Sequence, residues 1–524
     1  MQKLPPSIFN DVIGPVMRGP SSSHTAASVR IGKLIRQFFE SEIRSVDIDF
    51  TPGGSLATTY SSQGSDIGLV GGLLGMETAD PELVNSLEIA SGEEVEIGFN
   101  IVDYEALHPN TYRINVESKS GDKYCFIFIS TGGGMIELQS IDDIPVTING
   151  DYYETLLFFE TTDRDVVNEQ KVKLEQLMTD LDYCLTYTGE EYSVVNIKTG
   201  YPLPSFVLAA LKVSIKPAKI VQLEPVMPIS SRKNCVVPYS SAEELLKAAE
   251  KDNLALWELA VKYESARGNI TAGEVERIGN RLIKIMRASV ESGLAETDYS
   301  DRILEPQAPK MQNYGGRVIG GDQIKKTIAY ITAIMDTKSA MGVIVAAPTA
   351  GSCGALPGTL IAAAEDLGLN DDAVFKGLMA AAMVGILIAS RSTFAAEECG
   401  CQAECGSGSG MAAAGLVQIT DGTVREALDA AAMALQNIMG LVCDPVADRV
   451  EVPCLGKNIM AGVNAIASAN MALAGYDNVI PLDETIEALD QVGRMLPSEL
   501  RCTGRGGLAA TDTSKIIARR LSER

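Results

Sequence analysis

The spacing of apolar residues changes near residue 240, and this change limits the chain to a fold with several domains. Before it, apolar and polar residues alternate in several segments, such as Val46–Phe50, which is the pattern of a half-buried strand. After it, apolar residues recur at helical spacing, as at Ile324, Ile328 and Ile331. A chain of 524 residues is also too long to fold around one hydrophobic core.

We therefore predict a multidomain protein with an α/β N-terminal domain over residues 1–149 and a mostly all-α domain over residues 240–524. Strand and helix signals between residues 150 and 226 follow the order βαββαβ, which resembles an ACT regulatory domain. Residues 227–239, which contain Pro228 and Pro238, form the predicted linker.

The charge of the chain disfavours two classes of partner. A net charge of −24 repels nucleic-acid backbones and anionic lipid, so we expect neither a nucleic-acid nor a membrane partner. The N-terminus has no apolar segment of the signal-peptide type, and we expect a cytoplasmic protein. The longest apolar run, Leu378–Ser390, is shorter than the roughly 20 residues that cross a bilayer, and we expect a buried helix there.

Cysteines are concentrated in the helical part of the chain. Seven of the ten cysteines follow residue 350, and Cys401, Cys443 and Cys454 lie near glycine turns or helix starts. Backbone N–H groups at such places stabilise thiolates, and thiolates bind iron–sulfur clusters, zinc or copper. Two alternatives remain from spacing alone: small buried side chains in a tight core, or structural zinc, although paired C-x2-C motifs are absent.

Four motifs together resemble the iron–sulfur-dependent L-serine dehydratases, and they read CDPVADRVEVPCLGKN, GCQAECGSGSGMAAAGL, APTAGSCGALPG and GPSSSHTAASVRIG. The resemblance implies an enzyme of amino-acid degradation that eliminates water from L-serine to give pyruvate and ammonia. It implies that Cys401, Cys443 and Cys454 hold a [4Fe–4S] cluster with one iron left open as a Lewis acid. It also implies that residues 1–149 correspond to the small domain of that family. Cys399 and Cys405 are predicted to serve packing only, and the resemblance gives Cys353 no ligand role.

The segment Ser21–Thr25 is the main candidate for binding the substrate. Hydroxyl groups and free N–H groups at a helix start form an anion site, which suits an amino-acid carboxylate. The resemblance implies that this SSHT segment binds the carboxylate. Our candidate substrate-binding residues are Ser21, Ser22, Ser23, His24, Thr25, His108, Asn110, Gly133, Gly134 and Thr349. The glycines fit a hairpin turn equally well.

Gln63 departs from the family pattern. The family typically carries GHGTD or GHGSD, whose histidine is a candidate for the base, whereas this chain has SSQGSD. Glutamine cannot accept a proton at neutral pH, so another group such as His24 removes the α-proton, or the substrate differs. We name His24 and Gln63 as the candidate catalytic residues.

Other functions remain as alternatives. The substrate could be another small amino or hydroxy acid, or a β-thiol such as cysteine. The chain could be a non-catalytic sensor that combines an amino-acid-binding unit with an inactive cluster domain. A pyridoxal-phosphate enzyme is a third alternative, although no motif for its lysine or phosphate site is present. We expect a small amino-acid substrate and a homodimer.

Overall fold

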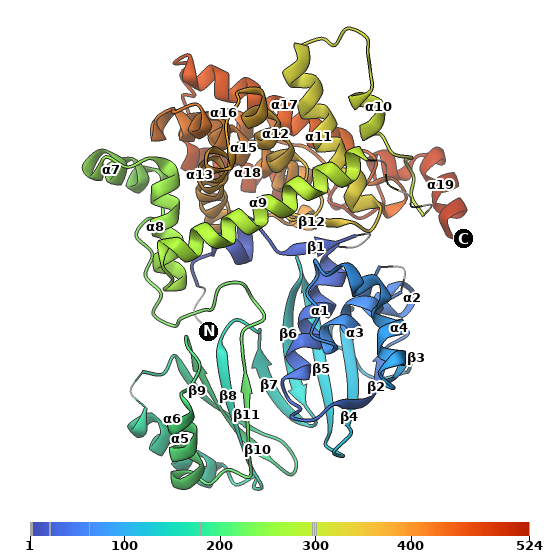
Figure 1. Cartoon of the computed structure of the whole chain (residues 1–524), viewed down its shortest axis with the longest axis vertical. Coiled ribbons are helices and arrows are strands. Elements are labelled where there is room, and N and C mark those ends of the chain that lie inside the picture. Colours follow the sequence, from blue (N-terminus) through green and yellow to red (C-terminus); the bar gives the residue numbers. More distant parts are fainter. Residues whose placement is uncertain are drawn as a thin grey trace. The chain divides into compact units, whose positions relative to one another are not determined.

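The computed structural model describes residues 4–19, 22–61, 63–178, 180–295, 297, 299 and 301–522. These residues form two compact units (Figure 1). The sheet unit comprises residues 4 and 22–235, and the helical unit comprises residues 5–19 and 236–522. The chain is therefore multidomain, with sheets in one unit and helices dominating the other.

The first part of the sheet unit is a six-stranded sheet in the order β3-β2-β4-β5-β6-β7, in which only the β2–β3 pair is parallel. Its strands are β2 (Ile43–Phe50), β3 (Glu96–Ile101), β4 (Thr111–Ser118), β5 (Lys123–Gly132), β6 (Met135–Ile141) and β7 (Ile144–Ile148). Its helices are α1 (Ser22–Arg36), α2 (Leu56–Thr59), α3 (Ser65–Leu73) and α4 (Ser86–Gly92). Helix α1 packs on β5 and β6 and on α3.

Glycines allow α1 and α3 to approach each other closely. A Cβ atom at Gly72 of α3 would lie 2.2 Å from the Val29 carbonyl oxygen of α1, and one at Gly32 would lie 2.3 Å from the Leu69 carbonyl oxygen. Any larger residue would push the two helices apart. This close packing fixes the start of α1 beside the turn that precedes α3.

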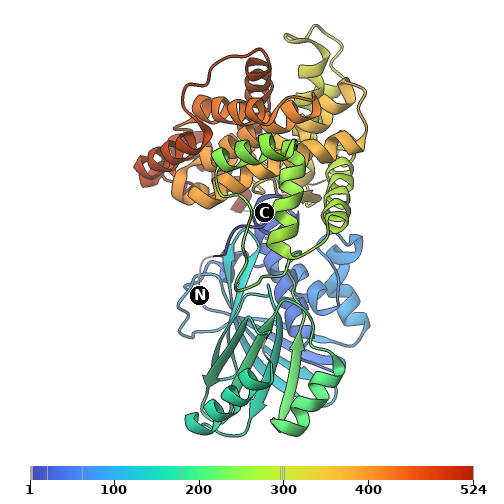
Figure 2. The same cartoon turned by 90° about the vertical axis from the view of Figure 1, so that its left-hand side faces the viewer.

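The second part of the sheet unit has the expected βαββαβ order. It consists of β8 (Tyr153–Phe159), α5 (Arg164–Leu177), β9 (Tyr183–Thr188), β10 (Ser193–Thr199), α6 (Ser205–Ser214) and β11 (Lys219–Leu223). The sheet order is β11-β8-β10-β9, and all its pairs are antiparallel (Figure 2). The relation to ACT domains stays a prediction.

Both faces of this second sheet are buried, because successive side chains of a strand point to opposite faces. Leu156 and Phe158 of β8 belong to the core that the six-stranded sheet forms with α1. Leu157 and Phe159 belong to a second core, which also contains residues of α5 and α6. Alternate residues of β8 thus pack against the six-stranded sheet on one face and against α5 and α6 on the other.

The helical unit contains thirteen α-helices and one strand pair among its described residues. The helices are α7 (Ala242–Asp252), α8 (Leu256–Gly268), α9 (Ala272–Leu294), α10 (Ala308–Gln312), α11 (Gly321–Ser339), α12 (Ala355–Asp366), α13 (Asp371–Arg391), α14 (Ala396–Cys399), α15 (Ser407–Ile419), α16 (Val424–Ile438), α17 (Cys454–Leu473), α18 (Leu482–Met495) and α19 (Asp512–Ser522). Helix α15 packs against α12, α13, α16 and α17. Its small residues permit this, since a Cβ at Gly415 would lie 2.8 Å from the Gly377 carbonyl oxygen of α13.

Helix α13 contains the apolar run Leu378–Ser390, and it is longer than that run. It has 21 residues and is the one helix among the described residues that is long and apolar enough to cross a membrane. Within the helical unit, 78% of its most apolar window is buried. The expectation of a buried helix is confirmed. The shortness of the apolar run is not sufficient evidence for it, because the helix that contains the run is long enough to cross a membrane.

The N-terminal segment belongs to the helical unit, which differs from the predicted domain over residues 1–149. Strand β1 (Val16–Arg18) pairs with β12 (Val343–Val345), and the π-helix Ile8–Val12 is buried. Glu264 of α8 accepts hydrogen bonds from the Ser7 hydroxyl at 2.5 Å and from the Ile8 N–H at 2.7 Å. Apolar burial and this buried carboxylate hold the segment, and neither is visible in the local sequence.

We predict that Glu264→Ala destabilises the helical unit by about 2–4 kcal/mol, because it leaves the Ser7 hydroxyl and the Ile8 N–H buried without an acceptor. Denaturant unfolding followed by the fluorescence of Trp257, the single tryptophan of the chain, measures this unit directly. Glu276→Ala, at an exposed position of α9, is the control and should leave the midpoint unchanged. Equal midpoints for both variants would contradict the prediction.

Candidate functional site

Three cysteines from distant parts of the chain lie together in the helical unit. Cys401 directly precedes the π-helix Gln402–Gly406, Cys443 lies in the loop after α16, and Cys454 is the first residue of α17. Their side chains are 2%, 3% and 6% exposed. The thiols of Cys401 and Cys443 interact directly, and the charge of Cys401 acts on Cys454. The structure therefore places the three predicted ligands close to one another, and their role as ligands stays a prediction.

The cysteines of this group change one another's pKa in opposite directions. Hydrogen bonds from the thiols of Cys405 and Cys443 lower the pKa of Cys401. The same contacts raise the pKa of Cys405 and of Cys443, and burial raises the pKa of Cys454 to about 12. A metal cofactor bound to all three predicted ligands would have to displace the protons of Cys443 and Cys454.

Lys457 connects two of the segments that carry these cysteines. Its ammonium donates to the Val442 carbonyl oxygen and to Asp444 Oδ1, both at 2.7 Å, so it binds the residues on either side of Cys443. Lys457 itself lies one turn after Cys454 in α17. Its positive charge lowers the pKa of Cys401 and of Cys454. The Lys457 side chain thus connects the start of α17 with the loop around Cys443, and its positive charge favours the thiolate form of the nearby cysteines.

Asn458 connects the cysteines with the loop before α12. Its amide nitrogen donates to the Gly351 carbonyl oxygen at 2.8 Å and to the Cys405 sulfur at 3.6 Å. Its amide oxygen accepts from the N–H groups of Gly354 and Ala355 at 3.2 and 3.0 Å. These two N–H groups at the start of α12 therefore already have a hydrogen-bond acceptor within the protein. Cys405, predicted to serve packing only, lies inside the cysteine group.

Cys502 is a residue that the sequence did not mark as part of this group. The Cys443 N–H donates to the Leu500 carbonyl oxygen at 2.8 Å, and the Cys502 N–H donates to the Cys443 carbonyl oxygen at 2.9 Å. The Cys502 thiol interacts with the Cys443 thiol. Cys502 adopts a φ of +59°, which is strained for a residue with a side chain. This contact could not be predicted, because Cys502 lies far from the other cysteines in the sequence.

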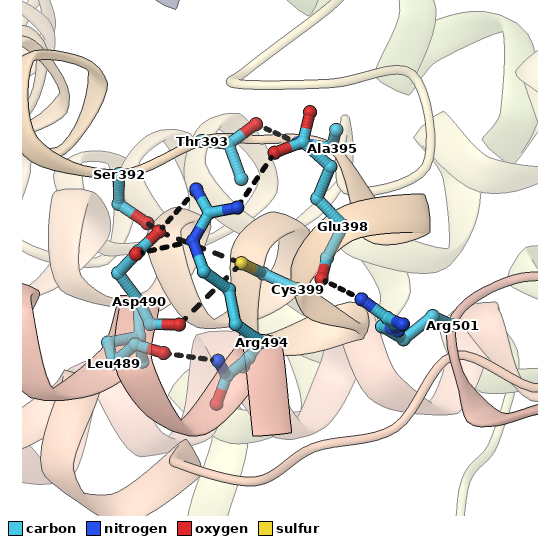
Figure 3. A network of polar contacts seen from close by, with 10 residues as sticks. Ser392, Thr393, Ala395, Glu398, Cys399, Leu489, Asp490, Arg494 and Arg501 are labelled. Carbon is cyan, nitrogen blue, oxygen red and sulfur yellow. Dashed lines mark hydrogen bonds and ion pairs between the residues drawn. The ribbon is translucent and has the colours of Figure 1, made fainter. Parts of the chain in front are cut away.

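Cys399 takes part in a polar network with residues of α18 (Figure 3). Its sulfur lies 3.7 Å from Asp490 Oδ1 and 3.9 Å from the Asp490 carbonyl oxygen. Arg494 Nε donates to Asp490 Oδ2 at 2.7 Å, and the Ser392 hydroxyl donates to Asp490 Oδ1 at 3.0 Å. The predicted packing role of Cys399 is consistent with this position.

Glu404 and Thr349 form a polar contact within the helical unit. The Thr349 hydroxyl donates to Glu404 Oε1 at 2.6 Å. Burial, and then the negative charge of Cys401, raise the pKa of Glu404 to about 8. Glu404 is not among the predicted site residues, although a glutamate among the apolar and small residues of GCQAECGSGSG is a detectable signal.

The donor atoms of the cysteine group are compatible with an iron–sulfur cluster. Among the described residues, no three Cys, His, Asp or Glu side chains are arranged around a position for one ion. The predicted ligands Cys401, Cys443 and Cys454 all offer sulfur, which is the usual donor for iron–sulfur clusters. Lys457 supplies a compensating positive charge beside them.

The candidate residues of the SSHT segment lie at the start of α1 in the sheet unit. Ser21 lies outside the described residues, and the side chain of Ser22 is likewise not described. Ser23 and His24 are partly exposed, and Thr25 is buried. Burial lowers the pKa of His24, so its imidazole is neutral at neutral pH and able to accept a proton.

Gln63 lies beside this helix start. The Thr25 hydroxyl donates to the Gln63 backbone carbonyl oxygen at 3.3 Å. Gly64 has a φ of +78°, and a Cβ there would lie 2.7 Å from the Thr25 hydroxyl, so glycine is required at this turn. The side-chain oxygen of Gln63 is buried and has no hydrogen-bond partner among the described residues. An unpaired buried amide of this kind is suited to binding a small polar ligand.

His108 and Asn110 form a local turn next to α2. The Asn110 N–H donates to His108 Nδ1 at 3.1 Å, and the Thr111 hydroxyl donates to the His108 carbonyl oxygen at 2.6 Å. The Ser55 hydroxyl, which directly precedes α2, hydrogen-bonds to Asn110 Oδ1. His108 Nδ1 therefore accepts a hydrogen bond that shapes the turn, which favours a positioning role over a catalytic one.

Gly133 and Gly134 form the hairpin turn between β5 and β6. Both have positive φ, +59° and +80°, as a two-residue turn of this kind requires, and Gly132 pairs with Met135. Arg30 of α1 donates to the Gly134 carbonyl oxygen at 2.5 Å. The turn is thus attached to the helix that carries the SSHT segment.

Comparisons with known proteins find matches to the part of the chain that contains the cysteine group. The family model of the serine dehydratase alpha chain matches residues 251–509, which include Cys401, Cys443 and Cys454. The L-serine dehydratase alpha chain of Peptoniphilus asaccharolyticus is 36% identical over 283 residues, which are 53% of this chain and 97% of that protein.

Two further relatives match a similar share of this chain. The probable L-serine dehydratase alpha chain of Bacillus subtilis is 35% identical over 285 residues, which cover 54% of this chain and 95% of that protein. L-serine dehydratase 2 of Escherichia coli is 30% identical over 292 residues, which cover 54% of this chain and 62% of that protein. Through its helical unit, the chain belongs to the serine dehydratase alpha chain family.

Proposed function

We propose that this protein is an iron–sulfur-dependent L-serine dehydratase, a lyase that converts L-serine to pyruvate and ammonia. The observation that carries the proposal is the meeting of Cys401, Cys443 and Cys454 in one buried group. Support comes from relatives that are named L-serine dehydratases and that align with this half of the chain.

Cys401, Cys443 and Cys454 would hold a [4Fe–4S] cluster, which supplies a Lewis-acidic iron for the departing hydroxyl group of the substrate. Lys457 and Asn458 would hold the cysteine segments together, because Lys457 of α17 binds both neighbours of Cys443, and Asn458 donates to the Cys405 sulfur and to the Cys454 carbonyl oxygen. The positive charge of Lys457 would favour the thiolate forms that cluster binding requires.

The sheet unit would bind the polar groups of the substrate. We assign the carboxylate to the start of α1 with Ser23 and Thr25, where the helix dipole favours an anion. The unpaired amide oxygen of Gln63 would accept a hydrogen bond from the substrate ammonium group. The neutral imidazole of His24 would accept the α-proton, the role that Gln63 cannot take.

A second candidate is a related lyase that acts on another small amino or hydroxy acid, and the presence of Gln63 favours it. A hydrogen-bonding amide in place of a base changes which substrate groups are bound well. We further propose that the protein acts in the cytoplasm as a homodimer, without nucleic-acid or membrane partners. Its net charge of −24 supports the absence of those partners.

The first prediction concerns the cluster. After anaerobic reconstitution with iron and sulfide, the unmodified protein should hold both elements and release ammonia and pyruvate from L-serine. Cys401→Ser, Cys443→Ser and Cys454→Ser should each lose most of the bound iron and all turnover, because a hydroxyl group is a poor ligand for the cluster. Cys399→Ser is the matched control, since Cys399 contacts Asp490 instead. Full iron content in Cys443→Ser would contradict the ligand assignment.

The second prediction concerns Gln63. If L-serine is the substrate and the base is weak, Gln63→His should raise kcat, because general-base help is typically worth roughly 10²–10⁴-fold. Gln63→Leu, which keeps the size and removes the amide, should raise KM. Steady-state assays on cluster-loaded protein measure both. No gain from histidine, together with faster turnover of another small acid by the unmodified protein, would favour the second candidate.

A further inference from the structure

A cavity of about 420 Å³ lies in the sheet unit, bordered by α1, α3, α4 and the strands β2 and β3 (Figure 1). This volume is in the range of sites that bind small molecules, roughly 300–1,000 Å³. Arg36, the last residue of α1, borders the cavity, whereas the SSHT segment is at the start of the same helix. About 16 Å of helix separates Arg36 from Thr25. The cavity is therefore distinct from the proposed substrate site.

The interior of the cavity is apolar. Ile43 of β2, Val70 and Leu73 of α3 and Ala90 of α4 line it, and each is at most 7% exposed. Among the described residues, the lining contains no hydroxyl, amide or aromatic side chain. Such a lining favours an aliphatic group of a ligand, and it leaves a hydroxyl group without a side-chain partner.

The charged side chains that border the cavity are Arg36, Glu42, Glu93 and Lys119. Lys119 Nζ and Glu42 Oε2 form an ion pair at 2.7 Å, so their charges compensate each other. Within the described part of the chain, neither Arg36 nor Glu93 forms an ion pair. One positive and one negative charge thus remain available to a ligand.

Arg36 is held in a fixed orientation at the edge of the cavity. Its Nη1 donates to the Phe39 carbonyl oxygen at 2.7 Å and to the Ser41 carbonyl oxygen at 3.2 Å. The donors of Nε and Nη2 have no acceptor among the residues that the structure describes. Nε and Nη2 lie on one side of a guanidinium group, where they can bind both oxygens of a carboxylate. The fixed orientation lowers the entropy cost of such binding.

The opposite charge lies where two helices end. Leu74 directly follows α3 and Glu93 directly follows α4, and both residues border the cavity. The C-terminal end of a helix carries a partial negative charge, which favours a cation. Glu93 adds a full negative charge. An ammonium group of a ligand is therefore favoured at this side of the cavity.

We propose that this cavity binds a free aliphatic α-amino acid, such as leucine, isoleucine or valine. The carboxylate of the ligand binds Arg36, its ammonium group binds Glu93 at the helix ends, and its side chain fills the apolar interior. L-Serine is excluded, because it has no aliphatic side chain to bury. The inference does not depend on the proposed dehydratase function, and it gives the sheet unit a second ligand.

Titration calorimetry on the intact protein tests the ligand class. L-Leucine should bind saturably. The compound 4-methylpentanoate is leucine without the ammonium group, and 3-methylbutylamine is leucine without the carboxylate. Each should bind roughly 10–100-fold more weakly than leucine, because each loses one charged contact. L-Serine should not compete with leucine for this site.

Variants test the location. Arg36→Gln and Glu93→Gln should each weaken leucine binding by roughly 10–100-fold. Arg36→Gln should leave the affinity for 3-methylbutylamine unchanged, since that compound has no carboxylate. Leu74→Phe, at a partly exposed position of the lining, should abolish leucine binding by filling the cavity. If Arg36→Gln does not fold, the other two variants decide.

The matched controls are Arg44→Gln and Glu94→Gln. Both residues are exposed and neither lines the cavity, and Arg44 pairs with Glu117 instead. Both controls should bind leucine like the unmodified protein.

Three results would overturn the inference. They are no saturable binding of leucine, isoleucine or valine at millimolar concentration, unchanged leucine affinity in Glu93→Gln and Leu74→Phe, and competition by L-serine as strong as that by leucine itself. None of these measurements depends on a bound cluster or on turnover of L-serine.

Discussion

The helical unit depends on the polar connections that hold three separate segments around one group of buried thiols. Thiols alone cannot do this, since they form only weak hydrogen bonds and pack like small apolar groups. Lys457 binds both neighbours of Cys443, and Asn458 binds the backbone of Cys454 and of the loop before α12. Asp444 adds a third connection, because its Oδ2 accepts from the Leu508 N–H at 2.9 Å. Buried polar side chains of this kind are satisfied only when all segments are in place.

This arrangement produces an unusual distribution of charge. Hydrogen bonds from two neighbouring thiols and the positive charge of Lys457 lower the pKa of Cys401, whereas burial and then the charge of Cys401 raise the pKa of Glu404 to about 8. Residues with opposing pKa changes at close range are typical of sites that perform acid–base chemistry.

Several features could be predicted from the sequence because they depend on local patterns. The βαββαβ order predicted between residues 150 and 226 follows from alternating and helical periodicities, and the structure has the same order from β8 to β11. The three cysteines were found through motifs, which carry information about distant contacts that spacing does not. The contact between Thr25 and the turn at Gln63 was not predicted, since it depends on the close packing of α1 and α3 through glycines.

Other features depend on tertiary contacts, and the sequence could not provide them. The position of Cys502 beside Cys443 results from backbone pairing between loops that are far apart in the chain. The neutral state of Glu404 results from burial, which no local pattern encodes. The place of residues 5–19 results from a buried glutamate on α8 and from the β1–β12 pair, and neither partner is near in sequence.

The path of the chain through the two units has a consequence for how such a protein can be divided. Residues 5–19 belong to the helical unit, residues 22–235 belong to the sheet unit, and the chain returns to the helical unit at residue 236. A gene split at the linker would therefore encode an N-terminal polypeptide that still carries Ser7 and strand β1, while Glu264 and β12 would be on the other polypeptide. The hydrogen bonds and the strand pair of residues 5–19 would then have to form between two separate polypeptides.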